Sequence, residues 1–303
     1  MLDRIRGLAI PPAWTDAWIC PWPNGHIQAT GTDNAGRRQY RYHDAWRILR
    51  DRQKFERVID FGRALPALRS VIETDLSLED ATEPRVVAAM VRLIDLGFFR
   101  IGGEEYAQEH ETFGIATLHR NHLSLQDGRA TFDFPAKDSI RRIVTVSDAA
   151  TFRLLQLLKR RNTGSGNLFA YRDGRRWADV RSEQVNSYIR AGAGGDFSAK
   201  DFRTWSGTVL GSVALARAAS KSPTLSRTGR QRAARLAAET VSDALGNTPA
   251  VARKSYIDPR VFDHFDVGET IVDALATPGG TDMNDRKVRE SIESAVIDLL
   301  SED

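Results

Sequence analysis

The sequence predicts an α+β protein in which a small β-rich N-terminal domain is followed by a mainly helical domain that carries a small antiparallel sheet. Short alternating runs separated by turn residues dominate residues 1–50, and helical periodicity begins at about residue 51. A chain of 303 residues, 41% hydrophobic and 27% charged, is long enough for two domains with a sizeable core. We therefore expect domains over residues 1–50 and 51–303.

The first domain alternates candidate strands with turns. Trp18–Cys20 precedes a Pro-Asn-Gly turn, and "HIQATGT" precedes a second turn at residues 33–36. The segment "RRQYRYH" then alternates as a half-buried strand does. From Asp51 the spacing becomes helical, and we expect Pro66 to interrupt this helix.

The second domain begins with helices and continues into a small sheet. "EPRVVAAMVRLIDLG" predicts a helix that starts near Pro84 and ends at Gly97. "HLSLQ" and "RATFDFP" flank Asp127-Gly128, which is a hairpin signal. "RRIVTVS" follows another turn at residues 136–139, and residues 115–147 therefore predict β structure.

Helices are expected to dominate beyond residue 148. "RTWSGTVLGSVALARAA" and "TGRQRAARLAAETVSDALG" are the clearest, and Gly246 ends the second. Thr248 and Pro249 suit the start of a short helix that closes at Tyr256. The tail carries one apolar stripe, formed by Val288, Ile292, Val296 and Leu299.

Several functional classes lack support in the sequence. It has no Walker loop, no dinucleotide glycine fingerprint, no HExxH motif and no paired carboxylates typical of two-metal sites. Its single cysteine, Cys20, excludes an intramolecular disulfide and a Cys-based zinc site. No apolar run is long enough for a membrane span or a signal peptide. We expect a cytoplasmic protein that uses no metal and no cofactor.

The small net charge of +3 conceals a strong asymmetry. Residues 151–235 carry 17 lysines and arginines against 5 acidic residues, whereas residues 257–303 carry 4 against 12. A basic middle segment favours a polyanionic partner, although a solvated helix face explains most such segments equally well.

One tyrosine and a set of upstream cations are the remaining candidates for chemistry. Tyr256 ends "GNTPAVARKSY", and a phenol with a pKa of about 10 attacks a phosphate well only where cations stabilise its ionised form. Arg203 and Lys200 lie at a predicted helix start, which suits a phosphate. Arg100 follows two phenylalanines, and Lys137 lies at a hairpin turn. Taken singly, each is explained as well by packing, a surface ion pair or solubility.

The order of these residues resembles that of the type IB DNA topoisomerases, in their poxvirus-like and bacterial branch. The motifs that carry the resemblance are "FFRIGGEEYA", "GIATL", "FPAKD", "KDFRTW", "GNTPAVARKSY" and the N-terminal "IPPAWTDAWICPWPNGHIQATGTDNAGRRQYRYHDAW". Together they cover nearly the whole chain. Because many members carry further N-terminal residues, we expect the first strand of the β-rich domain to be incomplete or supplied differently.

The resemblance implies an isomerase that relaxes supercoiled double-stranded DNA without ATP or metal. Tyr256 matches the nucleophile that forms a 3′-phosphotyrosyl bond and releases a 5′-hydroxyl. Arg100 and Arg203 match arginines that bind nonbridging oxygens, and Lys137 matches the general acid for the leaving oxygen. Lys200 matches a lysine that assists this proton transfer or holds a phosphate.

One position departs from the family pattern. Many members have histidine where this chain has Asn247, nine residues before the tyrosine. An amide can donate a hydrogen bond to a nonbridging oxygen but carries no charge. We expect Asn247 to act as a modest hydrogen-bond donor and not as an acid or base.

The resemblance also implies a set of DNA contacts. Gln39 and Tyr40 match residues that reach base edges, Arg37, Arg38 and Tyr42 would contact backbone, and Tyr106 matches another DNA-contacting position. Strand alternation places Gln39 and Tyr40 on opposite faces, so twist or a turn must reconcile them if both read bases. A solvated basic strand with packed tyrosines is the alternative. We expect a monomer that clamps around the duplex.

Two rival functions remain open. A tyrosine recombinase shares the catalytic chemistry, but it commonly has His-x-x-Arg where this chain has Lys200 to Arg203, and it usually pairs the catalytic domain with a helical one. A non-catalytic DNA-binding module would not need Arg100, Lys137, Arg203 and Tyr256 together.

Overall fold

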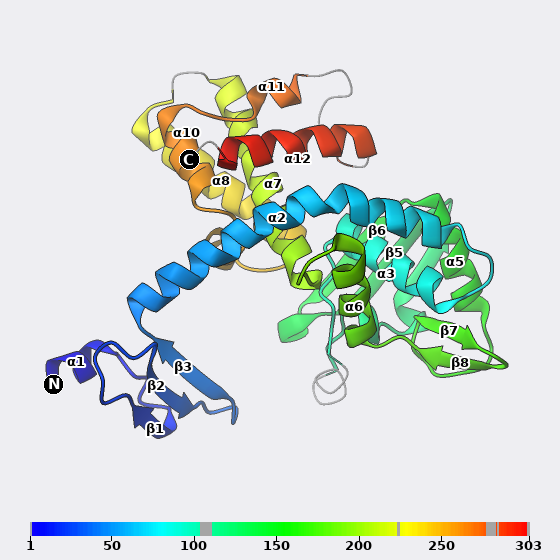
Figure 1. Ribbon diagram of the computed structural model, residues 1–303, viewed down its shortest axis with the longest axis horizontal. Coiled ribbons are helices and arrows are strands. Elements are labelled where there is room, and N and C mark those ends of the chain that lie inside the picture. The colour runs from blue at the N-terminus through cyan, green and yellow to red at the C-terminus, as the bar shows by residue number, and fades with distance from the viewer. Residues whose placement is uncertain (1, 104–110, 223–224, 277–282, 284, 302–303) are drawn as a thin grey trace. The chain divides into compact units, whose positions relative to one another are not determined.

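The computed structural model describes residues 2–103, 111–222, 225–276, 283 and 285–301 (Figure 1). It divides into two compact units, Met1–Arg57 and Val58–Asp303. Small antiparallel sheets accompany a mostly helical body, which confirms the α+β fold class. In the described part of the chain, no helix combines the length and the apolar character needed to cross a membrane.

The N-terminal unit contains a three-stranded antiparallel sheet. Its elements are α1 (Leu2–Gly7), β1 (Thr15–Ile19), β2 (Ile27–Thr32) and β3 (Arg38–Tyr42), with strand order β1-β2-β3. The guanidinium of Arg4 fastens α1 to the sheet by donating to Gln28 Oε1 at 2.6 Å and to the Cys20 carbonyl at 2.7 Å. The three strands lie where the sequence predicts them, whereas α1 was not expected.

Helix α2 (Asp44–Leu76) begins in the first unit and continues into the second, and Pro66 lies inside it. The expectation that Pro66 interrupts this helix was therefore wrong. Proline in a helix interior costs about 3 kcal/mol. Phe61, Leu65 and Leu68 on either side of it are fully buried, and burying each such side chain contributes about 1.5–3 kcal/mol. Packing therefore outweighs the local defect.

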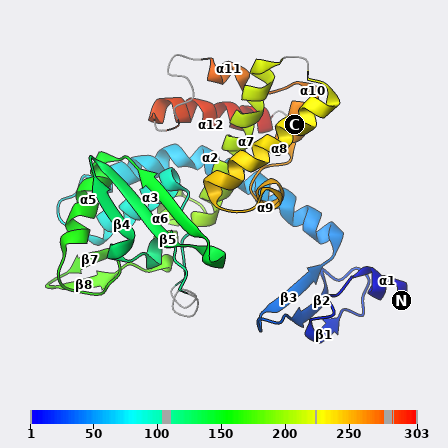
Figure 2. The same cartoon turned by 180° about the vertical axis from the view of Figure 1, so that it is seen from behind.

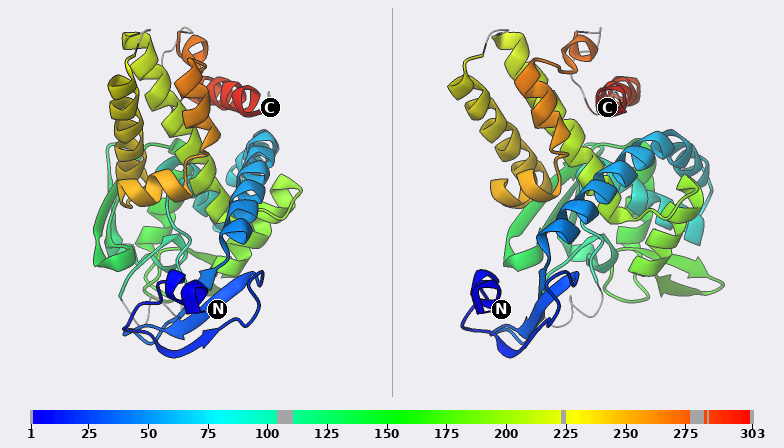
Figure 3. Two further views of the ribbon diagram at one scale, coloured as in Figure 1. Left: turned by 90° about the vertical axis from the view of Figure 1, so that its left-hand side faces the viewer. Right: turned by 60° about the vertical axis from the view of Figure 1, so that its left-hand side comes forward.

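The larger unit combines short strands with helices. Its first part comprises α3 (Glu83–Gly97), the 3₁₀ turns η1 (Ile115–Thr117) and η2 (Arg120–His122), β4 (Leu123–Gln126), β5 (Arg129–Pro135), the 3₁₀ turn η3 (Lys137–Ser139), β6 (Arg141–Val146), α5 (Ala149–Arg160), β7 (Ala170–Asp173), β8 (Arg176–Asp179) and α6 (Ser182–Ala193). Its second part comprises α7 (Ala199–Lys221), α8 (Arg227–Leu245), α9 (Pro249–Ser255), α10 (Arg260–Val267), α11 (Val272–Leu275) and α12 (Arg286–Ser301). Helices α7 and α8 pack side by side (Figure 3).

The sheet β4-β5-β6 forms as the turn residues predict. Asp127 and Gly128 both have positive φ, at 48° and 74°, and close the β4–β5 hairpin. A second hairpin, β7–β8, was not expected, because we predicted helices after residue 148. Its turn is Gly174-Arg175, between the paired Asp173 and Arg176, and glycine comes first in it, at φ 56°.

Helix α12 is attached to the core by apolar and ionic contacts. Ile292, Val296 and Leu300 are buried, and Val288 and Leu299 are partly buried, so the predicted stripe gains Leu300 as a core position.

A buried group of charges lies beside the stripe, and we call it the ion cluster: Arg69 of α2, Asp95 of α3, and Arg289 and Glu293 of α12. Arg69 contacts Asp95 at 3.0 Å and Glu293 at 2.6 Å, and Arg289 contacts Asp95 at 3.1 Å.

Candidate active site

The C-terminal end of α8 presents carbonyl oxygens that its own helix cannot satisfy. The chain turns at Gly246 with φ 61°, and the Gly246 and Asn247 N–H groups both donate to the Ser242 carbonyl. The carbonyls of Ala244, Leu245 and Gly246 are left for other partners, and the partial negative charge of a helix C-terminus favours cations there.

Three arginines from three elements donate to these three successive carbonyls. Arg142 of β6 reaches Ala244 at 2.5 Å, Arg203 of α7 reaches Leu245 at 2.8 Å, and Arg100, just after α3, reaches Gly246 at 3.0 Å. Figure 2 shows α8 ending beside α9. We call Arg100, Arg142 and Arg203 the arginine site.

Arg203 lies in the second turn of α7, so the expectation that it lies at the helix start was wrong. Ala199 begins the helix, and the carboxylate of Asp201 accepts hydrogen bonds from the backbone N–H and the hydroxyl of Ser198. Arg203 is only 4% exposed and donates to the Phe98 carbonyl at 2.6 Å in addition to Leu245. Two backbone acceptors therefore fix the direction of its guanidinium.

Tyr256 follows α9 and lies against α7. Thr248 caps α9 by accepting from the Val251 N–H, as the sequence predicts. The Tyr256 carbonyl accepts from the Thr208 hydroxyl at 3.3 Å, and a Cβ at Gly207 would lie 2.5 Å from that carbonyl oxygen. Glycine at 207 is therefore what allows the helix to approach the backbone of Tyr256 so closely.

The surroundings of Tyr256 favour its ionised form. The guanidinium of Arg203 lies 5.2 Å from the centre of the Tyr256 ring. Burial alone would raise the pKa of Tyr256, but the charge and hydrogen bonding of Arg203, with the charges of Arg100 and Lys200, lower the pKa below its usual value. Lys200 is exposed one turn before Arg203 and acts here through its charge.

The arginine site has no counter-charge among the residues that the structure describes. Burial first, and then the charge of Arg100, lowers the pKa of Arg142 to about 10. Burial, Arg100 and Arg142 also lower the pKa of Arg203 to about 10, although Tyr256 opposes this. Each of these arginines accordingly gains from a bound anion.

Asn247 lies next to Gly246 at this site. Its side-chain amide N and O are shielded from solvent and make no hydrogen bond with any described residue. An unsatisfied amide is costly to bury, and a ligand that accepts from it would recover part of that cost.

Lys137 is exposed at the β5–β6 turn, as predicted, where the Ala136 N–H bonds the Ile140 carbonyl. No contact joins Lys137 to the arginine site among the described residues. Tyr106 lies outside the described residues.

The predicted DNA-contacting residues of β3 divide between the two faces of the sheet. Tyr40 and Tyr42 stack with ring centres 6.0 Å apart and are 48% and 42% exposed, and strand alternation places Arg38 on their side. Gln39 faces the other way, and its amide donates to Asp33 at 2.8 Å. The strand therefore does not bring Gln39 and Tyr40 to one face.

Arg37 belongs to the turn that precedes β3. Its guanidinium pairs with Asp33 at 2.9 Å, and its backbone N–H also donates to that carboxylate. These hydrogen bonds, led by that of the Arg37 backbone, hold the pKa of Asp33 at about 2.

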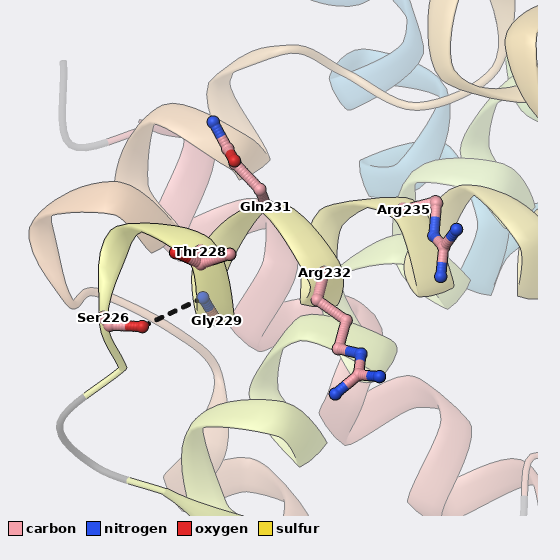
Figure 4. A pocket seen from close by; sticks show the side chains of 6 residues that line it. All are labelled: Ser226, Thr228, Gly229, Gln231, Arg232 and Arg235. Carbon is pink, nitrogen blue, oxygen red and sulfur yellow. Dashed lines mark hydrogen bonds between the residues drawn. The ribbon is translucent and has the colours of Figure 1, made fainter.

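The opposite end of α8 also carries arginines, but with a different environment. Ser226 caps the helix by accepting from the Gly229 N–H at 3.1 Å, and Arg232 and Arg235, further along the helix, are among the residues that line an open hollow (Figure 4). Both side chains are exposed. Exposed arginines on the same helix provide a contrast to the arginine site.

Arg142 was not identified from the sequence. In "RRIVTV" both alternating sets contain apolar residues, so the pattern cannot say which face is buried. Pairing with β5 decides this, because Arg142 lies opposite Phe134 and Val144 opposite Phe132, and both phenylalanines are buried. An arginine in register with core positions is the signal that was missed.

Comparison with known proteins identifies similar chains. Residues 43–265 match the eukaryotic DNA topoisomerase I catalytic core, and residues 1–33 match the bacterial DNA topoisomerase IB N-terminal domain. The chain is 30% identical over 261 residues to DNA topoisomerase 1B of Acanthamoeba polyphaga mimivirus, covering 84% of this chain and 77% of that protein. It is 31% identical over 157 residues to DNA topoisomerase 1 of Schizosaccharomyces pombe, covering 51% of this chain and 18% of that protein.

Proposed function

This chain belongs to the type IB DNA topoisomerases, and from that premise we propose that Tyr256 is its nucleophile and that the arginine site binds the scissile phosphate. The enzyme is an isomerase that relaxes supercoiled DNA through transient cleavage of one strand. These matches do not support the tyrosine recombinase alternative. The observation that supports the residue assignment most strongly is the position of Tyr256 beside guanidiniums that lack a carboxylate partner among the described residues.

The proposed reaction is a transesterification that conserves bonds. The phenolic oxygen of Tyr256 gives its proton to solvent water and attacks the phosphorus, a 3′-phosphotyrosyl bond forms, and the bond to the 5′-oxygen breaks. The departing 5′-oxygen takes a proton from Lys137, which lies at the β5–β6 turn. The reverse reaction, in which the 5′-hydroxyl attacks the phosphotyrosine, reseals the strand.

The arginine site supplies the positive charge for this reaction. Charge grows on the nonbridging oxygens as the pentavalent transition state forms, and Arg100 and Arg203 are fixed beforehand by backbone carbonyls. The same charges lower the pKa of Tyr256 and so favour the attacking phenolate. Lys200 contributes through its charge, and the Asn247 amide donates one hydrogen bond to the phosphate.

Because the phosphotyrosyl bond retains the energy of the phosphodiester, religation needs no ATP. We further propose that no metal is needed, since the guanidiniums stabilise the charge on the phosphate, as a metal ion would. The N-terminal unit contacts the duplex through β3 and the turn before it, Tyr106 adds a contact, and the chain acts in the cytoplasm as a monomer that encircles DNA. The boundary between the DNA-binding and catalytic domains lies near residue 50.

A plasmid relaxation assay tests the assignment. The parent protein should relax supercoils in EDTA without ATP, and Tyr256→Phe, which keeps the ring and its packing, should not. Relaxation by Tyr256→Phe would refute the proposed nucleophile. Strict dependence of the parent on added Mg²⁺ would refute the metal-free mechanism. Binding to a duplex should weaken steeply with salt, because phosphate contacts dominate such complexes.

A further inference from the structure

Arg142 has the features of a functional arginine and not of a surface charge. It lies on the core-facing side of β6, opposite the buried Phe134, and is partly buried. The preceding residue, Arg141, faces outward and pairs with Asp133 at 2.6 and 2.8 Å. Two adjacent arginines thus have different partners: Arg141 pairs with a carboxylate, whereas Arg142 donates to the neutral carbonyl of Ala244.

The geometry also places Arg142 against the same short segment as the other two arginines. A Cβ at position 246 would lie only 2.1 Å from Arg142 Nη1, and the Gly246 carbonyl is the acceptor for Arg100. Glycine at 246, at φ 61°, therefore permits both the helix-ending turn and the close approach of this guanidinium. Arg100 and Arg142 therefore both approach the same glycine.

The carbonyl contact leaves much of the donor capacity of Arg142 available. A guanidinium has five N–H donors, and the Ala244 carbonyl occupies one at 2.5 Å. The charges of Arg100 and Arg142 repel each other, and burial removes the water that would screen them. An anion with two or more oxygens, placed between them, would accept hydrogen bonds from the remaining N–H groups and offset the repulsion between the two guanidiniums.

We propose that Arg142 is a third arginine of the active site, which binds a nonbridging oxygen of the scissile phosphate together with Arg100 and Arg203. This inference rests on the proposed function of Tyr256. Its alternative is a purely structural arginine that only caps the end of α8. The two differ because a phosphate-binding arginine responds to the charge on the phosphate, whereas a helix cap does not.

The test measures single-turnover cleavage by Arg142→Gln, with saturating protein, on a duplex that carries a mapped cleavage site. Glutamine keeps an N–H donor for the Ala244 carbonyl but removes the charge. A second duplex carries a methylphosphonate at the scissile position, which replaces a charged nonbridging oxygen with a methyl group. Arg141→Gln, which removes the same charge one residue away on the exposed face, is the matched control.

Loss of one transition-state donor lowers the rate by about 100-fold or more, so Arg142→Gln should show a loss of that order on the phosphodiester. On the methylphosphonate duplex the cleavage rate of Arg142→Gln should be lower than that of the parent by a much smaller factor. Arg141→Gln should cleave both duplexes at the parental rate. Equal losses on the two duplexes, or no loss, would overturn the proposal and leave Arg142 as a helix cap.

Folding and the underlying function are checked separately. If Arg142→Gln does not give the parental thermal unfolding curve, Arg142→Met, which keeps a long side chain but removes the charge, is compared on the two duplexes by the same criterion. Cleavage by Tyr256→Phe would refute the proposed function itself. Inactive Tyr256→Phe combined with fully active Arg142 variants would refute only the role of Arg142.

Discussion

Two groups of buried or partly buried arginines in the larger unit differ in their partners. In the ion cluster, Arg69 contacts two carboxylates at 3.0 and 2.6 Å, and although burial would lower its pKa, Asp95 and Glu293 raise it. In the arginine site, Arg142 and Arg203 donate to carbonyls, and burial lowers the pKa of both to about 10. Burial is therefore common to the two groups, whereas the charge of the partner differs between them.

The two groups predict opposite consequences of mutation. Removing a charge from the ion cluster leaves another charge buried without its partner, which affects folding. Removing a charge from the arginine site relieves repulsion between cations but removes stabilisation of the phosphate. Stability and cleavage should therefore separate between the two groups.

The largest expected effect is on cleavage by Arg203→Ala. This variant loses the guanidinium nearest the Tyr256 ring and should cleave about 10³-fold more slowly at saturating protein, the upper range for loss of one transition-state donor. Single-turnover cleavage measures it, with Arg235→Ala, an exposed arginine on α8, as the control. A loss of less than tenfold would contradict the assignment of Arg203.

Mutation of the ion cluster should lower the free energy of unfolding. Glu293→Ala leaves Arg69 with one carboxylate fewer, and breaking a buried pair in this way costs about 3–5 kcal/mol of unfolding free energy. Glu73→Ala, which removes one of the two carboxylate partners of Arg286 on α12, should cost less than about 1 kcal/mol. Urea unfolding measures both.

The cleavage rate of folded Glu293→Ala should stay close to that of the parent. A severe loss of cleavage in a stably folded Glu293→Ala protein would show that the two groups are not independent.

A third change displaces the nucleophile without touching a charge. In Gly207→Ala the new methyl would lie 2.5 Å from the Tyr256 carbonyl oxygen, so the backbone of Tyr256 must shift. Small misplacements of reacting groups reduce rates by up to about 100-fold, and we expect a decrease of that order or somewhat less in single-turnover cleavage. Gly166→Ala, where an added Cβ meets nothing within 4 Å, should be neutral. Parental cleavage by Gly207→Ala would argue against a fixed position for Tyr256.

Asn247 sharpens the comparison, because its amide is uncharged. Loss of one hydrogen bond to a charged oxygen corresponds to about 1.5–3 kcal/mol, so Asn247→Ala should cleave roughly ten- to a hundredfold more slowly. The pH dependence of cleavage should keep its shape, since an amide does not titrate. Cleavage at the parental rate would remove Asn247 from the site.

The smallest expected effect concerns pH. The positive charge of Lys200 is one of the contributions that lower the pKa of Tyr256, after those of Arg203 and Arg100. In Lys200→Gln the pKa of Tyr256 should therefore rise, so that Tyr256 ionises at higher pH than in the parent. Titration of ¹³C-tyrosine by NMR, with the Tyr256 signal assigned by Tyr256→Phe, measures this shift, and a downward shift would contradict the electrostatic account.

Much of the fold follows from local sequence signals. Asp127-Gly128, Gly246 and the Thr248–Pro249 pair each specify a turn or cap through their own backbone preferences, and the structure contains all three. Pro66 was misjudged because its cost is local, whereas the burial of its neighbours depends on helices that are distant in the sequence.

The candidate site was predictable only in part. Arg100, Arg203 and Tyr256 were named from motifs, and the structure brings them together at the end of α8. The role of the α8 carbonyls, and with it Arg142, could not be read from the sequence, because it depends on the β5–β6 register and on how α8 meets the strand. Pairings between distant segments decide such contacts.

The most direct test of the central claim is to trap the covalent intermediate. The parent protein is incubated with a duplex whose cleaved strand is labelled on the 5′ side of the cleavage site, the part that stays joined through its 3′-phosphate; the complex is then denatured and digested with trypsin. We predict that the label remains joined to a peptide containing Tyr256 and that Tyr256→Phe yields no adduct. An adduct at another residue, or an unchanged yield from Tyr256→Phe, would contradict the account.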